Sequence, residues 1–140
     1  MRTYLDASVL VALLTQDPHT ARTVALLRGR LPTLVLSTFA RTEFASAVVR
    51  RLRMAALTEE EARAASDAID LRAAQAAERL EVEPADVRAA ERFVRRLGPP
   101  LKAPDAVNIA IVLRTGATLA TFDIRMAAAA RAFRGEVAEA

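Results

Sequence analysis

The chain has 140 residues, the size of one ordinary domain, so a single domain over residues 1–140 is expected. Apolar residues make up 53% of it and charged residues 26%, a balance that indicates a folded globular protein rather than a disordered one. Cysteine is absent, histidine occurs once, and the formal net charge is only +3. The sequence therefore excludes disulfides, thiol nucleophiles and Cys/His zinc sites, leaves oxygen as the ligand for any metal, and permits a nucleic-acid partner without requiring one.

Membrane insertion is not expected. No apolar run approaches the roughly 20 residues that cross a bilayer, and the N-terminal stretch carries Asp6 where a signal peptide would need an apolar core. We therefore expect a cytoplasmic location.

The chain is predicted to open with a strand followed by two helices. The strand, over 2–5, ends at Asp6, and Ser8 is expected to cap the apolar helix 9–14 that follows. A second helix, over 19–30, starts after an Asp-Pro break. Asp6 is thereby placed where the first strand stops.

A second apolar strand, over 34–37, leads into a helix over 39–54 that begins at Ser37 or Thr38. Several side chains of this helix follow helical spacing and are expected to lie toward one side of it: Phe39, Glu43, Ala47 and Arg50. Glu43 lies in its first turns.

The middle of the chain is predicted to be mainly helical. A Thr-x-x-Glu capping box at Thr58 opens a long Ala-rich helix that runs to about Ala77. A short strand over 80–83 and a helix over 84–98 follow.

Another acid, Asp105, opens the next predicted helix. Pro104 is suited to the first turn of this helix, which runs to a glycine stop at Gly116. Asp105 therefore lies at a helix N-terminus.

The last predicted strand, over 117–122, ends at Asp123 and is followed by a helix over 124–133, while 135–140 is expected to add an edge strand. Strands alternating with helices indicate an α/β fold with a parallel sheet. Such sheets place their sites beyond the carboxyl ends of the strands, where Asp6 and Asp123 are expected.

Four of the 17 acidic residues interrupt mainly apolar sequence, where an unpaired carboxylate is costly to desolvate. They are Asp6, Glu43, Asp105 and Asp123. Each alone is explained as a helix cap or first-turn acid, favourable by about 0.3–1 kcal/mol through the helix dipole. Together at the strand ends and helix starts of one small sheet, converging carboxylates would raise one another's pKa unless a cation joins them. Most other acids lie in mixed-charge helices, where solvent and arginine partners account for them.

Oxygen ligands favour Mg²⁺ or Mn²⁺, and a carboxylate cluster that holds such an ion indicates phosphodiester hydrolysis by an activated water. The sequence contains no nucleophile elbow, P-loop or G-x-G-x-x-G fingerprint that would favour other chemistry.

Three segments of the sequence match the motifs of a known family. They are YLDASVLVALL, STFARTEF and LKAPDAVNIAIVLRTGATLATFD. In this order they resemble the PIN-domain family, in particular the VapC-type toxins of bacterial toxin–antitoxin pairs, and the resemblance covers nearly the whole chain. The most specific matches are an acid after the first strand, P-D-A opening a helix, and T-x-D after the last strand.

The resemblance implies a single PIN domain over 1–140, built as a three-layer α/β/α sandwich around a mainly parallel sheet of four or five strands. It implies a metal-dependent ribonuclease that hydrolyses RNA phosphodiester bonds and acts as the toxin of a toxin–antitoxin pair. The matching acids would bind Mg²⁺ or Mn²⁺, with Asp6 and Asp105 at the heart of the site and Glu43 and Asp123 completing it.

Neighbouring positions also match the family. Ser8 and Thr121 fall at small polar positions beside the metals, although Ser8 is equally explained as a helix cap. Asn108 falls where relatives often carry His, and it is expected either to touch substrate or to pack. Arg125 and Met126 stand where many relatives have a further acid or Asn, a departure that bears on a second metal site.

Four arginines lie near Glu43 or end its helix, and they are candidates for holding RNA phosphates or for complementing the helix dipole. They are Arg41, Arg50, Arg51 and Arg53. Aromatic residues are too scarce to predict a stacking platform for bases. The resemblance implies a homodimer, formed by apolar faces of the first helices and the Ala-rich middle pair, and a cognate antitoxin that blocks the acidic groove.

Two other classes compete with this interpretation. A non-catalytic Mg-binding α/β regulatory module, such as a receiver-like domain, would show paired early acids and a late strand-end Lys, whereas Lys102 precedes a helix. A haloacid-dehalogenase-type phosphatase requires D-x-D after the first strand, where this chain has Asp6 followed by Ala7 and Ser8.

Overall fold

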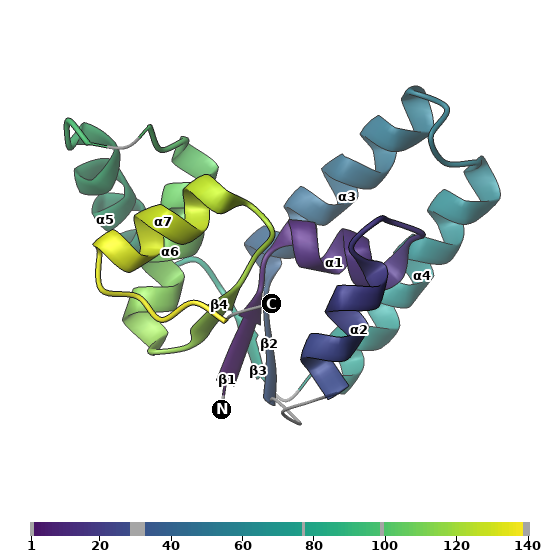
Figure 1. The fold of residues 1–140 in the computed structure, drawn as a ribbon, viewed down its shortest axis with the longest axis horizontal. Helices are drawn as coiled ribbons and strands as arrows, with labels where there is room; N and C mark the ends of the chain where they lie inside the picture. The colour runs from purple at the N-terminus through teal and green to yellow at the C-terminus, as the bar shows by residue number, and fades with distance from the viewer. Residues whose placement is uncertain (1, 29–32, 77, 99, 139–140) are drawn as a thin grey trace.

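Parallel strands need long crossovers, and this chain places helices between each strand and the next. The computed structural model describes residues 2–28, 33–76, 78–98 and 100–138 (Figure 1). Its strands are all parallel, in the order β3-β2-β1-β4: β1 (Arg2–Leu5), β2 (Thr33–Ser37), β3 (Glu78–Leu80) and β4 (Thr118–Ala120). The predicted three-layer α/β/α sandwich with a parallel sheet is confirmed, and within the described ranges the sheet has four strands.

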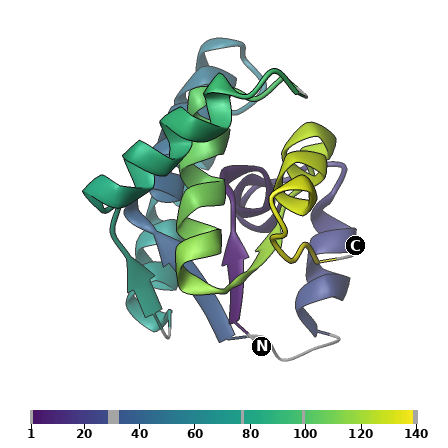
Figure 2. The same cartoon turned by 90° about the vertical axis from the view of Figure 1, so that its left-hand side faces the viewer.

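Helices cover both faces of this sheet. On one face lie α1 (Ala7–Leu14), α2 (Thr20–Arg28), α3 (Thr38–Arg53) and α4 (Glu59–Gln75). On the other lie α5 (Pro84–Arg95), α6 (Ala103–Thr115) and α7 (Ile124–Ala132), which Figure 2 shows from their own side. Among the residues that the structure describes, no helix is long and apolar enough to cross a membrane.

The order of the strands reverses at β1. The chain places β2 and then β3 on one side of β1, crosses to the other face through α5 and α6, and places β4 on the opposite side of β1. This change of face is what right-handed crossovers require when the direction along the sheet reverses. The reversal leaves a crevice beyond the carboxyl ends of β1 and β4, the usual place for an active site in such sheets.

Strand positions differ from the prediction in two places. The third strand lies at 78–80 rather than 80–83, because the chain after Leu80 already turns into the N-cap of α5 at Glu83. The predicted edge strand over 135–140 is reduced to a single bridge between Val137 and Leu119, and its last two residues lie outside the described chain.

One predicted helix cap is wrong. Asp6, not Ser8, caps α1: its backbone is extended, and its carboxylate accepts the Val9 N–H at 3.0 Å. Ser8 already lies inside the first turn of the helix. Of the two residues predicted to begin α3, Ser37 is the N-cap and Thr38 is the first helical residue, and the Thr58 capping box predicted for α4 is confirmed.

Helix ends follow local chemistry. Gly116 ends α6 as predicted and adopts φ 69°, the left-handed conformation that favours glycine. The helix predicted over 84–98 ends earlier, at Arg95. The helix predicted over 19–30 is seen as α2, and its predicted last two residues lie outside the described chain.

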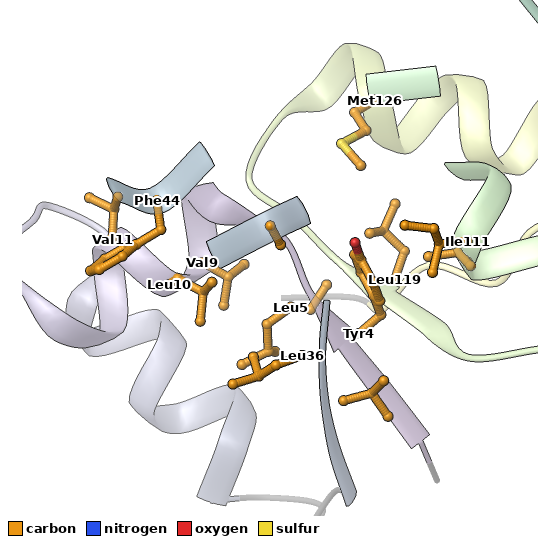
Figure 3. Close-up of a cluster of buried hydrophobic side chains, with 14 of the residues drawn as sticks. Tyr4, Leu5, Val9, Leu10, Val11, Leu36, Phe44, Ile111, Leu119 and Met126 are labelled. Atoms are coloured by element: carbon orange, nitrogen blue, oxygen red, sulfur yellow. The ribbon is translucent and has the colours of Figure 1, made fainter. Parts of the chain in front are cut away.

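The core has two parts, one on each face of the sheet (Figure 3). Successive residues of β1 point to opposite faces, so Tyr4 packs toward α6 and α7 while Leu5 packs toward α1 and β2. Both side chains are almost fully buried, as are Phe44 and Leu119. Each such side chain contributes roughly 1.5–3 kcal/mol of burial free energy, and together they fix the sheet that positions the candidate site.

A buried ion pair joins α5 to α6. Asp86, whose side chain is 2% exposed, accepts hydrogen bonds at 2.8 and 2.9 Å from the Arg114 guanidinium. Burial would raise the pKa of Asp86, but the bonds from Arg114 and from the Glu83 N–H outweigh it and lower that pKa. Asp86 therefore serves the fold, a role that the local sequence around it did not indicate.

Candidate active site

The four predicted acids come from four elements that meet at the crevice. Asp6 and Asp123 follow β1 and β4 as the N-caps of α1 and α7, Asp105 lies in the first turn of α6, and Glu43 lies in α3. Glu43 and Asp123 line one open cleft of about 610 Å³, together with residues adjacent to Asp6 and Asp105. The fold thus brings all four predicted positions to one side of the sheet.

Asp6 is held rigidly beside the residues that line this cleft. It is 5% exposed, and one carboxylate oxygen accepts the Ser8 hydroxyl at 2.6 Å as well as the Val9 N–H. The other oxygen accepts the Thr121 hydroxyl. Burial raises the pKa of Asp6 despite these hydrogen bonds, and the charge of Asp123 raises it further. This desolvated carboxylate is therefore poised to gain from a nearby cation.

Ser8 and Thr121 also fix the loop that carries Asp123. Ser8 accepts the N–H of Phe122 at 3.0 Å, and Thr121 accepts the N–H of Asp123 at 3.0 Å. Each hydroxyl therefore donates to Asp6 and accepts from the loop after β4. The two strand ends are joined through this pair of bridges.

Glu43 is anchored by a buried network. Asn108, which is 1% exposed, donates from Nδ2 to Glu43 Oε1 at 2.6 Å and accepts the Tyr4 hydroxyl at 2.5 Å. The Tyr4 oxygen also lies 2.6 Å from the hydroxyl oxygen of Ser37. Burial raises the pKa of Glu43; the hydrogen bond from Asn108 lowers it, and the charges of Asp105 and Asp6 raise it. Asn108 is thus a positioning residue, which packs in the core and holds the Glu43 carboxylate by a hydrogen bond.

Asp105 differs from Asp6 and Glu43 in how it is held. Its carboxylate is half-buried, and within the described chain no hydrogen bond shifts its pKa. Burial and the charge of Asp123 raise the pKa of Asp105, while Lys102 lowers it. Asp105 is therefore the acid with the least fixed partner, although it is within electrostatic reach of Asp6 and Asp123.

The acids do not stand in a finished ligand set. Within the described ranges, no three acidic or histidine side chains have the mutual spacing needed to hold a metal ion. The donor chemistry nevertheless fits Mg²⁺ or Mn²⁺, because all the candidate ligands are oxygens and three of the four carboxyl groups have pKa values raised by burial and by their neighbours.

Comparison with known proteins decides the family. The family model described as "PIN domain" matches residues 3–132. The chain belongs to the PIN-domain family. No curated protein sequence matches it significantly.

Solved structures share the fold of this PIN domain at low sequence identity. VapC20 from Mycobacterium tuberculosis, a sarcin-ricin loop cleaving toxin, is 22% identical with a TM-score of 0.73, over 91% of this chain and 94% of its own. FitAcB from Neisseria gonorrhoeae is 20% identical with a TM-score of 0.68, over 98% and 96%. VapBC2 from Rickettsia felis, bound to a DNA fragment from the promoter, is 14% identical with a TM-score of 0.68, over 99% and 98%.

The positions after the T-x-D segment of this PIN domain contribute to packing rather than to the acidic cluster. Met126 is 2% exposed and lies in the core, with its sulfur 3.9 Å from the Thr121 hydroxyl. Arg125 is exposed. Neither residue offers a carboxylate to a second metal position.

The basic residues near Glu43 divide into two groups. Arg50 and Arg51 line the cleft, and Arg51 forms an ion pair with Asp17 at 2.8 Å. Arg41 instead pairs with Asp70 of α4, also at 2.8 Å. The cleft also contains three planar side chains: Phe39, which was predicted on the same side of its helix as Glu43, and two that sequence patterns did not place there, His19 and Phe122. His19 and Phe122 come from separate segments of the chain, so no local motif could have grouped them with Glu43.

Proposed function

We propose that this PIN domain is a Mg²⁺- or Mn²⁺-dependent ribonuclease that hydrolyses RNA phosphodiester bonds. The observation that supports it best is that four acids from four distant segments come close enough to shift one another's pKa values, with two of them, Glu43 and Asp123, lining the cleft and the other two, Asp6 and Asp105, directly beside residues that line it. These acids would hold the ion, because a dication relieves the cost of gathering desolvated negative charge.

A bound divalent ion would polarise a phosphoryl oxygen and lower the pKa of the attacking water. The chain's own residues prepare for this. Asp6 is locked by two hydroxyl groups and an N–H, and Glu43 is locked by Asn108. Arg50 and Arg51, in the same cleft, supply positive charge for the RNA backbone.

We also propose that the protein acts as the toxin of a toxin–antitoxin pair, forms a homodimer and works in the cytoplasm with a cognate antitoxin. The shared fold with VapC20, a sarcin-ricin loop cleaving toxin, and with the VapBC2 structure supports this role. Induced expression in a bacterial host should stop growth. The Asp105→Asn variant, produced to the same level, should not.

RNA cleavage tests the enzymatic proposal directly. Purified protein is incubated with total RNA and Mg²⁺ or Mn²⁺, with and without EDTA. We expect cleavage that EDTA abolishes, that Asp6→Asn and Asp105→Asn lose, and that Asp67→Asn retains, because Asp67 is an exposed acid of α4 outside the cleft. Cleavage that persists in EDTA would contradict the proposal. Binding of Mg²⁺ without any cleavage would favour a regulatory module.

A further inference from the structure

Planar side chains gather in the candidate active-site cleft. The chain has only five Phe, one Tyr and one His, and no Trp. Three of these seven rings, His19, Phe39 and Phe122, line the cleft together with Glu43 and Asp123. Tyr4 and Phe44 are core residues. A chain so poor in rings therefore places a large share of them beside its acids.

Two of the cleft rings are stacked on each other. The ring centroids of His19 and Phe122 are 4.5 Å apart, with an interplanar angle of 14°. Both residues are only partly buried, so this pair forms part of an open wall rather than of the core. The Arg22 guanidinium lies 5.5 Å from the Phe122 centroid and adds positive charge to the stack.

The Phe122 side of the stack is fixed relative to the acids. Phe122 directly precedes Asp123 in the chain, and its N–H donates to Ser8 at 3.0 Å. Ser8 in turn donates to Asp6. The Phe122 ring is therefore next in sequence to the candidate metal ligand Asp123, and the backbone that carries it is linked to Asp6 through the Ser8 hydroxyl.

The His19 side is fixed from α3. Asp17 accepts the backbone N–H of His19 at 2.8 Å with one carboxylate oxygen and the Arg51 guanidinium at 2.8 Å with the other. Arg51 and its neighbour Arg50 line the same cleft. A connected set of hydrogen bonds thus runs from the basic end of α3 through Asp17 to the backbone of His19, whose ring forms one side of the stack.

A second stack in this protein shows that such geometry alone does not identify a nucleic-acid site. Phe93 and Phe133 are stacked with centroids 4.3 Å apart, and Arg96 lies 4.8 Å from the Phe133 centroid. Their groove is lined by Leu97, Leu101 and other apolar residues, and it contains no acid. Only the His19–Phe122 stack combines rings, arginines and carboxylates within the described residues.

We propose that the stacked pair of His19 and Phe122 is a subsite for an unpaired nucleobase of the RNA substrate, next to the scissile phosphate. The proposal rests on the ribonuclease function proposed above. Unpaired bases stack on aromatic rings and on guanidinium planes, and such stacking tolerates any base. Arg50 and Arg51 suit the adjoining phosphates, so the cleft offers complementary chemistry for both parts of a nucleotide.

Binding of a fluorescein-labelled single-stranded RNA, measured by anisotropy in EDTA to prevent hydrolysis, tests this subsite. Phe122→Leu and His19→Leu should weaken binding about five- to hundredfold. His19→Phe keeps a ring and should retain most of the affinity. Phe133→Leu is the matched control, because it breaks the remote stack and should leave RNA affinity unchanged.

A set of oligonucleotides that each lack one base sharpens the test. One of these oligonucleotides, which lacks the base that stacks on the rings, should bind wild-type protein as weakly as intact RNA binds Phe122→Leu. Combining that oligonucleotide with Phe122→Leu should lower the RNA affinity no further than either change alone. Thermal melting verifies that each variant is folded, and the partly exposed His19 provides the same test if Phe122→Leu unfolds the protein.

The outcomes separate the two proposals. If the wild-type protein cleaves RNA but both leucine variants in the cleft bind RNA as tightly as it does, the subsite is refuted while the ribonuclease function stands. If the wild-type protein neither binds nor cleaves RNA, both proposals fail. A loss that is equal for the cleft variants and for Phe133→Leu would also overturn the subsite.

Discussion

Replacing Asn108 with leucine should destabilise the protein by about 2–3 kcal/mol, because it removes a buried amide whose partners remain. The Glu43 carboxylate loses a hydrogen bond of the charged type, which contributes about 1.5–3 kcal/mol. The Tyr4 hydroxyl keeps its contact with Ser37 and so loses only about 0.5–1 kcal/mol. The two losses together come to about 2–4 kcal/mol. Since Glu43 is only partly buried and its carboxylate can regain a hydrogen bond from water, the lower part of this range applies.

Urea unfolding followed by circular dichroism measures this effect. Leucine has the same branching and the same number of side-chain heavy atoms as asparagine, so the urea dependence should keep its slope while the midpoint falls. The melting temperature should drop by roughly 5–15 °C. Gln75→Leu also replaces an amide side chain with leucine, at an exposed position of α4, and should stay within about 0.5 kcal/mol of wild type. If Asn108→Leu were equally neutral, the network would not hold Glu43 in place.

Two further predictions concern the scaffold. Asp86→Asn should destabilise the protein by about 1–3 kcal/mol at pH 7, because it removes the negative charge of the buried partner of Arg114. Since folding lowers the pKa of Asp86, the stability difference should be full above about pH 4, the ordinary range of Asp, and should vanish as the pH falls through the folded-state pKa. Urea unfolding at several pH values measures this dependence. Gly116→Ala should cost about 1 kcal/mol purely through its φ of 69°, because an added Cβ would meet no atom within 4 Å, and a melting temperature equal to wild type would refute that explanation.

The sequence was sufficient to predict the positions of the four acids in the fold. Strand ends and helix starts can be recognised from local residue patterns, so Asp6, Asp105 and Asp123 could be assigned to them directly. Parallel strands then require their carboxyl ends to meet at one edge of the sheet. The reversal of strand order between β1 and β4, which creates the crevice itself, depends on long-range strand pairing that no local pattern encodes.

The partners of these acids were harder to predict, because they come from distant parts of the chain. Asn108 joins Tyr4, 104 residues earlier, to Glu43, 65 residues earlier. Nothing in the local sequence records such a contact, so packing and substrate binding could not be separated for Asn108. The structural role of Asp86 was missed for the same reason, since its arginine partner lies 28 residues away on another helix.

The error at the first helix has a local cause. Ser8 and Asp6 are both good cap residues, and sequence alone does not reveal which of them has the extended backbone of an N-cap. The structure gives that conformation to Asp6, with φ −79° and ψ 173°. The correction matters for the site, because the capping carboxylate is also the proposed metal ligand and Ser8 becomes a bridge to the loop after β4.

Mn²⁺ binding, measured by electron paramagnetic resonance as loss of the free-ion signal, tests the shared acidic site most directly. Wild-type protein should bind Mn²⁺, Mg²⁺ should compete for the site, and Asp6→Asn or Asp105→Asn should weaken binding at least about tenfold, on the order of the effect of losing one charged ligand. Asp67→Asn should bind as wild type does. Equal Mn²⁺ affinity in wild type and Asp105→Asn, or no binding by the folded wild-type protein, would contradict the account of one metal site built from these four acids.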